Sequence, residues 1–518
     1  MKRILIIGLW LLATHLWSQE IGFQEIALLT SQISNEYAFR VHGVGDVNGD
    51  LYPDFTVSKS LDADTYVHLY FGGANFDTIP DLTFHGEQTL EYYGAAITSG
   101  DLNGDGINDI VIGAPEHDRG AQWNSNEGRI YVYLGGTSLD SIPDRIFTGE
   151  EPSAQLGYSL EWSSDVDGDS YPDLLVGAPA HWSEFGRLFI FSATPGGMFE
   201  IDTLSWEATG DVNKRGSLGY SIAPLGDINA DGLGDFLVAA PLLYSEEPGH
   251  VYLVYGDSFP SLSQAIAFPG DTTQPNYNYG RSVIDLGHLT GDSTSYFGIN
   301  IHTEMQIYSC TTLSPIDTLM LLEGWGSISD IATAGDLNTD GRSDFLIGID
   351  NPPQTNLYFG GIPFDSIPNH SIYGTGQKIS ALGDINQDGQ PEFGIIDWEL
   401  YSRCHIYTYG IIDGIQKQDN TQNLPAQIAL SSYPNPFNAN TTIQYHLPAQ
   451  GKVTIRIHNL AGHEVLSQEI GYQSAGIYTF RWNNMSTQNL PSGVYFCTIT
   501  VENTTQKYRQ SIKITLLK

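Results

Sequence analysis

The chain has 518 residues, of which 60 are Asp or Glu and only 22 are Lys or Arg, so its formal net charge is -38. This charge argues against nucleic acid and anionic membrane surfaces as partners, because both attract basic proteins. The length exceeds what one compact core accommodates, and indicates a large array with a smaller domain.

The N-terminus has the pattern of a secretory signal peptide over residues 1–18. Lys2 and Arg3 precede an apolar run from Ile4 to Leu12, and the stretch ends near Gln19. The run is too short to span a bilayer as a helix, so cleavage is expected, with an N-terminal membrane anchor as the alternative. No other stretch is long and apolar enough to cross a membrane, so no transmembrane span is expected in the mature protein.

A nine-residue pattern then recurs along most of the chain. Its clearest copy is DLNGDGIND, from Asp101 to Asp109: an acid, an apolar residue, Asn, any residue, Asp, usually Gly, two more residues and a last carboxylate. Further copies begin at Asp46, Asp165, Asp227, Asp336 and Asp384, and a degenerate copy begins at His288. The starts are separated by 55, 64, 62, 61, 48 and 48 residues, which is the period of a repeat architecture rather than of one active site.

The side chains of the pattern predict a calcium loop. Oxygen donors at positions 1, 3, 5 and 9 around a tight turn suit Ca²⁺, with a backbone carbonyl near position 7 completing its shell. The six intact loops hold nineteen carboxylates at these positions, and a bound cation would offset their repulsion. Turns that merely join strands are the alternative, which six copies in one register disfavour.

The expected calcium ligands are Asp46, Asn48, Asp50 and Asp54; Asp101, Asn103, Asp105 and Asp109; Asp165, Asp167, Asp169 and Asp173; Asp227, Asn229, Asp231 and Asp235; Asp336, Asn338, Asp340 and Asp344; and Asp384, Asn386, Asp388 and Glu392. In the fifth copy His288, Thr290 and Tyr296 replace three ligands. Up to six calcium ions are therefore expected.

The residues around the loops predict strands. Position 12 is Val57 or Ile112 where an EF-hand needs Glu, and apolar runs such as IVIGAP follow the loops. A third strand such as RIYVYLGG from Arg129 and a fourth after turns such as LDSIPD complete a four-stranded antiparallel unit. The last unit ends after three strands, and the early strand from Gly22 is expected to supply its fourth.

Motifs beside the loops resemble a known family. LGYS precedes two loops, from Leu156 and Leu218, and GAP follows two, from Gly113 and Gly177. The combination resembles the FG-GAP repeat of integrin alpha-subunit propellers and many bacterial surface proteins. The resemblance implies an all-β fold with a seven-bladed β-propeller over residues 19–411 and calcium in its inter-strand loops.

In such a meander the loops after GAP and those between blades share the face opposite the calcium loops. That face is where the resemblance puts ligand contacts, and exposed aromatic side chains mixed with polar ones suit binding. Packing of these aromatics against neighbouring loops is the alternative for any single residue. The candidate ligand-face residues are His117, Arg119, Trp123, His181, Trp182 and Tyr244.

The C-terminal part differs in charge. Residues 412–430 have the polar composition of a linker, and residues 431–518 carry seven Lys or Arg against three Glu. Their strands predict a small Ig-like β-sandwich. YPNPFNANTTIQYHLP, HNLAGHEV, LPSGVYF and the terminal KITLLK closely resemble the C-terminal sorting domain of the type IX secretion system. The resemblance implies contact with that machinery, export across the outer membrane, and surface attachment or release.

Cysteine usage is sparse. Cys310, Cys404 and Cys497 form neither a disulfide framework nor a zinc motif, so buried free thiols are expected, with a Cys310–Cys404 bridge as the alternative.

Three functions fit these features. The favoured one is a secreted or surface-attached calcium propeller that binds an extracellular protein or glycan without catalysis. The alternatives are a hydrolase or lyase that acts on polysaccharide with the propeller as scaffold, and a structural surface-coat protein. No nucleophile or metal-hydrolase motif is found, and calcium accounts for each repeated carboxylate, so no catalytic residue is assigned.

Overall fold

The computed structural model divides into two compact units, Ile21–Gly410 and a smaller unit that includes Ile411–Lys518. The predicted signal peptide and most of the predicted linker lie outside the described residues. The structure describes residues 20–29, 36–61, 64–74, 76–119, 125–180, 186–192, 204–206, 216–241, 249–258, 260, 262–270, 279–301, 304–320, 327–350, 353–361, 368–397, 403–412, 429–433, 441–447, 451–460, 463–473, 476–482, 490–502 and 507–516.

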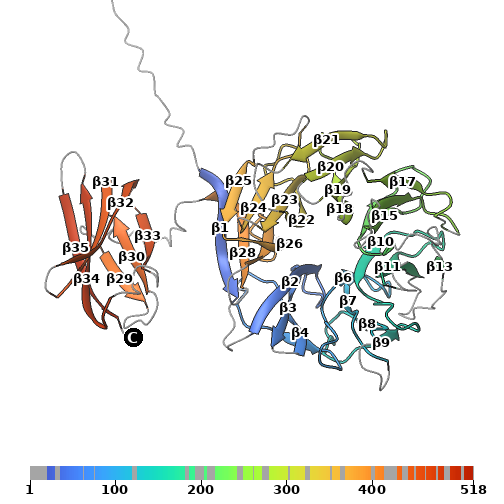
Figure 1. Ribbon diagram of the computed structural model, residues 1–518, viewed down its shortest axis with the longest axis horizontal. Helices are drawn as coiled ribbons and strands as arrows, with labels where there is room; N and C mark the ends of the chain where they lie inside the picture. The colour runs from blue at the N-terminus through green and yellow to red at the C-terminus, as the bar shows by residue number, and fades with distance from the viewer. Residues whose placement is uncertain are drawn as a thin grey trace, which may run out of the picture. The chain divides into compact units, whose positions relative to one another are not determined.

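The larger unit is a ring of seven four-stranded antiparallel sheets, which confirms the predicted seven-bladed propeller (Figure 1). The innermost strands of blades one to seven are β2 (Glu36–Gly45), β6 (Ile97–Gly100), β10 (Ser159–Ser163), β14 (Ile222–Gly226), β18 (Tyr279–Gly287), β22 (Ile328–Gly335) and β26 (Thr375–Gly383). The second strands are β3 (Asp54–Leu61), β7 (Asp109–Ala114), β11 (Asp173–Ala178), β15 (Asp235–Ala240), β19 (Tyr296–Ile301), β23 (Asp344–Asp350) and β27 (Glu392–Asp397). The second strands are almost wholly buried, as their continuous apolar runs predict.

The outer two strands of each blade complete the sheets. The third strands are β4 (Asp64–Tyr70), β8 (Arg129–Tyr133), β12 (Arg187–Ser192), β16 (His250–Val254), β20 (Glu304–Ser309), β24 (Pro353–Tyr358) and β28 (Cys404–Ile412). The fourth strands are β5 (Leu82–His85), β9 (Arg145–Thr148), β13 (Leu204–Trp206), β17 (Ile266–Pro269), β21 (Pro315–Met320), β25 (His370–Tyr373) and, in the seventh blade, β1 (Glu20–Leu29).

Strand β1 closes the ring without a covalent link, as predicted. It lies beside β28 in the sheet β1-β28-β27-β26, so the seventh blade combines both ends of the propeller sequence. The Phe23 ring packs edge-on against Tyr409 at 5.3 Å, and Glu25 pairs with His405 at 3.2 Å. Packing and an ion pair thus fasten the closing strand.

The hydrophobic core is divided among the blade interfaces. The described buried residues of the ring form seven clusters, and each joins two neighbouring blades. The cluster between the first and seventh blades holds Val57 of β3, Ile406 of β28 and Leu29 of β1. Each blade is therefore stabilised by both neighbours, which is why the ring has to close.

The glycines of the repeat motif have a steric role at these interfaces. The amide of Gly157 donates to the carbonyl of Gly177 in its own blade at 3.2 Å, and Gly157 has a φ of 85°. A Cβ atom at Gly113, in the preceding blade, would collide with the Gly157 carbonyl oxygen, and Gly177 faces Gly219 in the same way. Paired glycines thus let the backbones of adjacent blades approach closely.

The smaller unit contains two antiparallel sheets. One has the order β29-β30-β33 and the other β32-β31-β34-β35. Ile443 and Trp482 of the first sheet share a buried cluster with Ile455 and Ile499 of the second, so the sheets pack face to face as a small sandwich. Whether its topology is Ig-like stays a prediction. The strands are β29 (Ala429–Tyr433), β30 (Thr441–Leu447), β31 (Gly451–Asn459), β32 (Glu464–Gln473), β33 (Gly476–Trp482), β34 (Gly493–Glu502) and β35 (Lys507–Leu516).

Candidate calcium loops and the opposite face

The repeated loops all lie on one face of the ring, because each joins the inner strand of a blade to the second strand. Six share one backbone conformation, in which positions 4 and 6 both have positive φ. Glycine fills most of these positions, as this conformation favours. The pairs are Gly49 and Leu51, Gly104 and Gly106, Gly168 and Ser170, Ala230 and Gly232, Thr339 and Gly341, and Gln387 and Gly389.

This backbone turns the loop amides toward the side chain at position 1. In the second loop Asp101 accepts hydrogen bonds from the amides of Gly104 at 2.7 Å, Asp105 at 3.0 Å and Gly106 at 2.8 Å. Asp105 in turn accepts one from the amide of Ile107 at 2.9 Å. The oxygens of positions 1 and 5 are thereby fixed on the inside of one tight turn, as a calcium loop requires.

The carboxyl group at position 9 is a buried anchor. All six are 0 % exposed: Asp54, Asp109, Asp173, Asp235, Asp344 and Glu392. One oxygen of Asp109 accepts the amide of Leu102 at 2.9 Å, and the other accepts the amide of Gly135, after the third strand, at 2.7 Å. The same two bonds recur at Asp54, Asp235 and Asp344. The carboxyl group at position 9 is therefore a predicted calcium ligand, and it also links the loop to its own blade through hydrogen bonds.

Burial of these groups changes their acidity. Desolvation raises the pKa of Asp109 to about 6, although hydrogen bonds from Gly135 and Leu102 oppose it. For the same first cause the pKa of Asp173 rises to about 7 and that of Glu392 to about 8, and neighbouring loop carboxylates add to both shifts. The unneutralised anions are thus unfavourable where they lie, and a nearby cation would favour their charged form.

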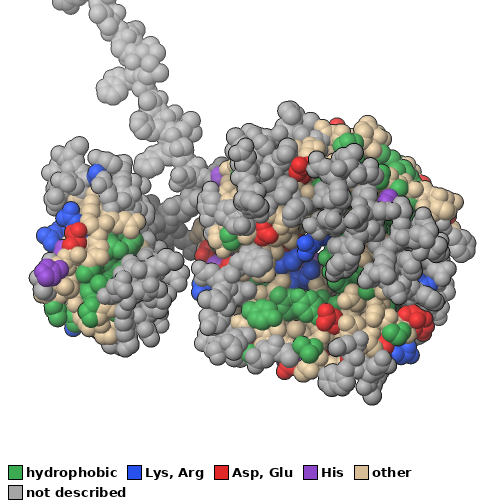
Figure 2. All heavy atoms as spheres, viewed as in Figure 1, with side chains coloured by type: hydrophobic (Ala, Val, Ile, Leu, Met, Phe, Trp, Pro, Cys, Tyr) green, Lys and Arg blue, Asp and Glu red, His purple; other side chains and the backbone are tan. Residues whose placement is uncertain are grey.

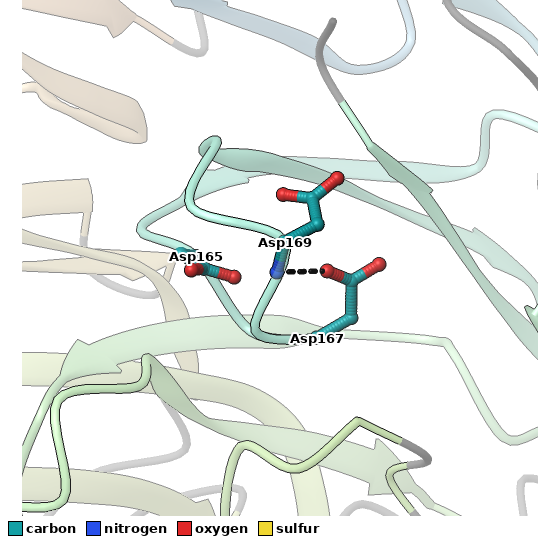
Figure 3. Close-up of side chains that lie close together, drawn as sticks. All are labelled: Asp165, Asp167 and Asp169. Carbon is teal, nitrogen blue, oxygen red and sulfur yellow. Dashed lines mark hydrogen bonds between the residues drawn. The ribbon is translucent and has the colours of Figure 1, made fainter.

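Two loops bring three carboxyl groups close enough to share one ion. Asp165, Asp167 and Asp169 converge in the third loop, drawn in Figure 3, and Asp384, Asp388 and Glu392 converge in the seventh. In the third loop Asp173 also has a buried carboxylate oxygen, Oδ1, that has no hydrogen-bond partner among the described residues. A buried anionic oxygen without a donor is costly, so the donor set of this loop fits a hard divalent cation.

The degenerate fifth loop is closed by hydroxyl groups. The hydroxyl of Thr290, at position 3, donates to Asp292 at 2.7 Å and lies 3.1 Å from the phenol oxygen of Tyr296, at position 9. Position 6 lacks the positive φ of the other six loops. At positions 3 and 9 of this loop, hydroxyl groups therefore stand where the other loops have an amide or carboxyl group.

Backbone hydrogen bonds link several loops to the next blade. The carbonyl of Asp46 accepts the amide of Asn108 at 3.0 Å, and the carbonyl of Val47 accepts that of Gly136 at 2.8 Å. Across the closure, the carbonyl of Ile385 accepts the amide of Gly73 at 2.7 Å. Ordering of one loop therefore restrains the neighbouring blade.

On the opposite face the structure describes two of the six candidate ligand residues. His117 is only 1 % exposed, and its imidazole lies 2.6 Å from Glu91 and 3.3 Å from the side-chain nitrogen of Gln88. It is thus a buried structural group and is not presented to a ligand. Arg119 is exposed. Trp123, His181, Trp182 and Tyr244 lie outside the described residues.

The sequence did not lead us to predict the cavity at the centre of the ring. The seven inner strands enclose about 800 Å³, lined partly by Arg40 of β2, Arg281 of β18 and Lys378 of β26. Basic side chains are visible at the centre of the ring in Figure 2. Arg40 and Lys378 each lie six residues before a loop, and Arg281 lies seven before one. Basic residues are rare in this acidic chain. Their recurrence six or seven residues before a loop was the sequence signal that could have predicted the cavity.

The cysteines follow the main expectation. Cys310, Cys404 and Cys497 are all free and buried, so the alternative Cys310–Cys404 bridge is absent. Burial raises the pKa of each thiol to about 12, which makes them unreactive packing groups at neutral pH.

Comparisons with known proteins agree with this architecture. The FG-GAP repeat family matches residues 93–133 and 156–186, and the secretion system C-terminal sorting domain family matches residues 431–513. Similar relatives include integrin alpha-5 of Xenopus laevis, 30 % identical over 44 % of this chain, and integrin alpha-V of Gallus gallus, 32 % identical over 40 %. Integrin alpha-IIb of Homo sapiens is 31 % identical over 37 % of this chain.

The matched stretch spans 22, 20 and 18 % of these three relatives, so the chain covers about a fifth of their length. No helix among the described residues is long and apolar enough to cross a membrane. The sorting domain indicates export by the type IX secretion system to the extracellular space or cell surface. The chain is therefore an exported β-propeller protein that combines FG-GAP repeats, homologous to those of integrin alpha chains, with a C-terminal sorting domain.

Proposed function

We propose that this secreted propeller is a calcium-dependent binding protein that holds an extracellular glycan or protein ligand without catalysis. The observation that carries the calcium part is the set of six wholly buried position-9 carboxyl groups, each beside further acidic loop residues. Buried anions are retained where a partner compensates for their desolvation, and a divalent cation is the partner that oxygen-rich loops select.

The residues that would hold the ion are those at positions 1, 3, 5 and 9 of the six intact loops. The bound ion would neutralise the carboxylates and cross-link the two ends of each loop. Because several loops are hydrogen-bonded to the next blade, we expect calcium to stiffen the ring as well as the single loops. The third loop, with four carboxyl groups, is expected to bind most tightly.

The binding part rests on the face opposite the loops. There the chain changes from repeated motif to variable loops, as expected where a scaffold carries recognition residues. The repeated carboxyl groups at position 9 are engaged with backbone amides, which suits a structural role better than a role as acid or base. The relatives reported above are integrin alpha chains, and neither matched family is an enzyme family.

The test is a glycan and matrix-protein array probed with the mature protein, once in calcium and once in chelator. We expect saturable binding in calcium that weakens in chelator, and further weakening on Trp123→Ala and Trp182→Ala. Arg145→Ala, on the exposed outer strand β9, is the control expected to change nothing. Cleavage of an arrayed polysaccharide, or no binding by a calcium-loaded protein, would contradict the proposal.

A further inference from the structure

The central cavity has the size and chemistry of a ligand site. Its volume of about 800 Å³ lies within the range of roughly 300 to 1,000 Å³ that ligand pockets occupy. Every blade contributes to its wall through the inner strand, so the wall is as rigid as the ring. Figure 2 shows basic side chains at the ring centre, in a protein with 22 basic and 60 acidic residues.

Two guanidinium groups in this cavity lack a hydrogen-bonding or ion-pair partner within the part of the chain that the structure describes. Neither Arg40 nor Arg281 makes a side-chain hydrogen bond or an ion pair with a described residue. Lys378, by contrast, lies 3.4 Å from the carboxylate of Asp330. Arg40 is also half-buried, so its guanidinium has lost part of its hydration, and no described carboxylate lies within ion-pair distance of it. Such a group is poised to bind one.

Among the described residues, the three carboxyl groups in the cavity, Glu161, Asp285 and Asp330, form no ion pair with Arg40 or Arg281. Burial raises the pKa of Glu161 to about 7, although Arg40 opposes the shift, so Glu161 is only partly charged near neutral pH. Asp285 accepts a hydrogen bond from the amide of Gly287 at 2.9 Å. Asp330 is held by Lys378 and by the amide of Ile379.

Aromatic rings line the same cavity as the basic groups. Tyr92, Tyr158 and Tyr220 lie just before the inner strands of the second, third and fourth blades, at the end away from the calcium loops. The Tyr158 and Tyr220 rings are 5.0 Å apart at 44°. Arg40 and Arg281 lie on the first and fifth blades, and both act electrostatically on the Tyr158 hydroxyl. The mouth of the cavity away from the calcium loops therefore combines aromatic rings with basic groups.

We propose that this mouth binds a uronic-acid residue of an acidic saccharide, with its carboxylate on Arg40 and Arg281 and its ring on Tyr158 and Tyr220. A guanidinium forms paired, charge-assisted hydrogen bonds with a carboxylate. The Tyr rings offer flat apolar faces with a polar edge, which suits the C–H face and hydroxyl groups of a sugar. A uronate residue carries both a carboxylate and an apolar C–H face on one rigid sugar ring. This inference rests on the proposed binding function and names its ligand class.

The experiment is calorimetric titration of the full mature chain, saturated with calcium, with a hexamer of β-1,4-linked glucuronate. Cellohexaose, the neutral sugar of the same backbone, and hexaglutamate are the comparison ligands. We expect the uronate alone to bind, with an affinity that falls as salt increases. Arg40→Gln and Arg281→Gln should each weaken binding about tenfold or more, since each removes charge-assisted hydrogen bonds. Tyr158→Leu should weaken it as well.

Arg145→Gln is the matched control, because Arg145 is exposed on outer strand β9, and it should bind as the parent does. Arg281 is exposed, so Arg281→Gln keeps the test sound even if Arg40→Gln fails to fold. Equal binding of cellohexaose, preference for hexaglutamate, or uronate binding that both Arg variants retain would overturn the inference. If no uronate binds while the array shows another calcium-dependent ligand, the proposed uronate site in the central cavity is refuted and the proposed binding function stands.

Discussion

The position-9 carboxyl group should have a role that the exposed loop carboxylates lack, and Asp109→Ala tests it. The change removes the acceptor for two buried amides, those of Leu102 and Gly135. Each unsatisfied donor costs about 1 to 3 kcal/mol, so we expect a loss of about 2 to 6 kcal/mol even in chelator. In calcium the loss should be larger, because the ion site is removed as well.

Asp105→Ala is the matched comparison in the same loop. Asp105 is exposed, and its carboxylate accepts the backbone amide of Ile107 and the side-chain amide of Asn103, two donors of the same loop that water can satisfy. In chelator the change should cost under about 1 kcal/mol. In about 10 mM calcium, with a dissociation constant on the order of 10⁻⁴ to 10⁻³ M, loss of the site should cost about 1.4 to 2.7 kcal/mol.

Urea unfolding of both variants and the parent, in calcium and in chelator, separates the two roles. If Asp109→Ala lost stability only in calcium, its carboxylate would be a ligand and not an anchor of the blade. If Asp105→Ala lost the same amount in both conditions, the loop would not hold the ion.

Three further predictions concern pH, ring closure and the fifth loop. The raised pKa values of Asp109, about 6, and Glu392, about 8, mean that without metal these groups contribute stability below their unfolded pKa, near pH 4, which is lost as pH rises toward 8. The melting temperature in chelator should fall over that window, and the increment gained from calcium should grow; identical profiles with and without calcium would contradict this. Phe23→Ala removes ring contacts between β1 and β28 and should cost about 1 to 3 kcal/mol, since Phe23 is half-buried, with faster hydrogen exchange in β28 than in β11; uniform exchange would mean that β1 does not fasten the ring. The triple variant His288→Asp, Thr290→Asn, Tyr296→Asp restores the ligand pattern of the fifth loop and should add one bound calcium by metal analysis; an unchanged count would show that loop conformation, not ligand identity, excludes the ion.

The position and conformational repeat of the acidic loops could be predicted from the sequence because their pattern is local. All four ligand side chains of a loop fall within nine residues, and seven copies with apolar strands after them indicate a propeller. The closing strand was also predictable, since the last unit visibly lacked a fourth strand. These inferences need only the spacing of residues along the chain.

The remaining features depend on residues distant in sequence. His117 looked like a surface residue beside GAP, but its partner Glu91 lies 26 residues earlier and buries it. The anchor role of Asp109 depends on Gly135, which is 26 residues later. The central cavity is lined by Arg40 of the first blade and Arg281 of the fifth, and these residues line one cavity only because the ring closes.

Calcium counting on the purified mature chain tests the central claim most directly. After equilibrium dialysis against calcium, metal analysis should find six ions per chain, and these should be lost on dialysis against chelator with a fall in melting temperature. No bound calcium, or bound calcium that leaves the melting temperature unchanged, would contradict a propeller whose buried loop carboxylates are neutralised by the ion.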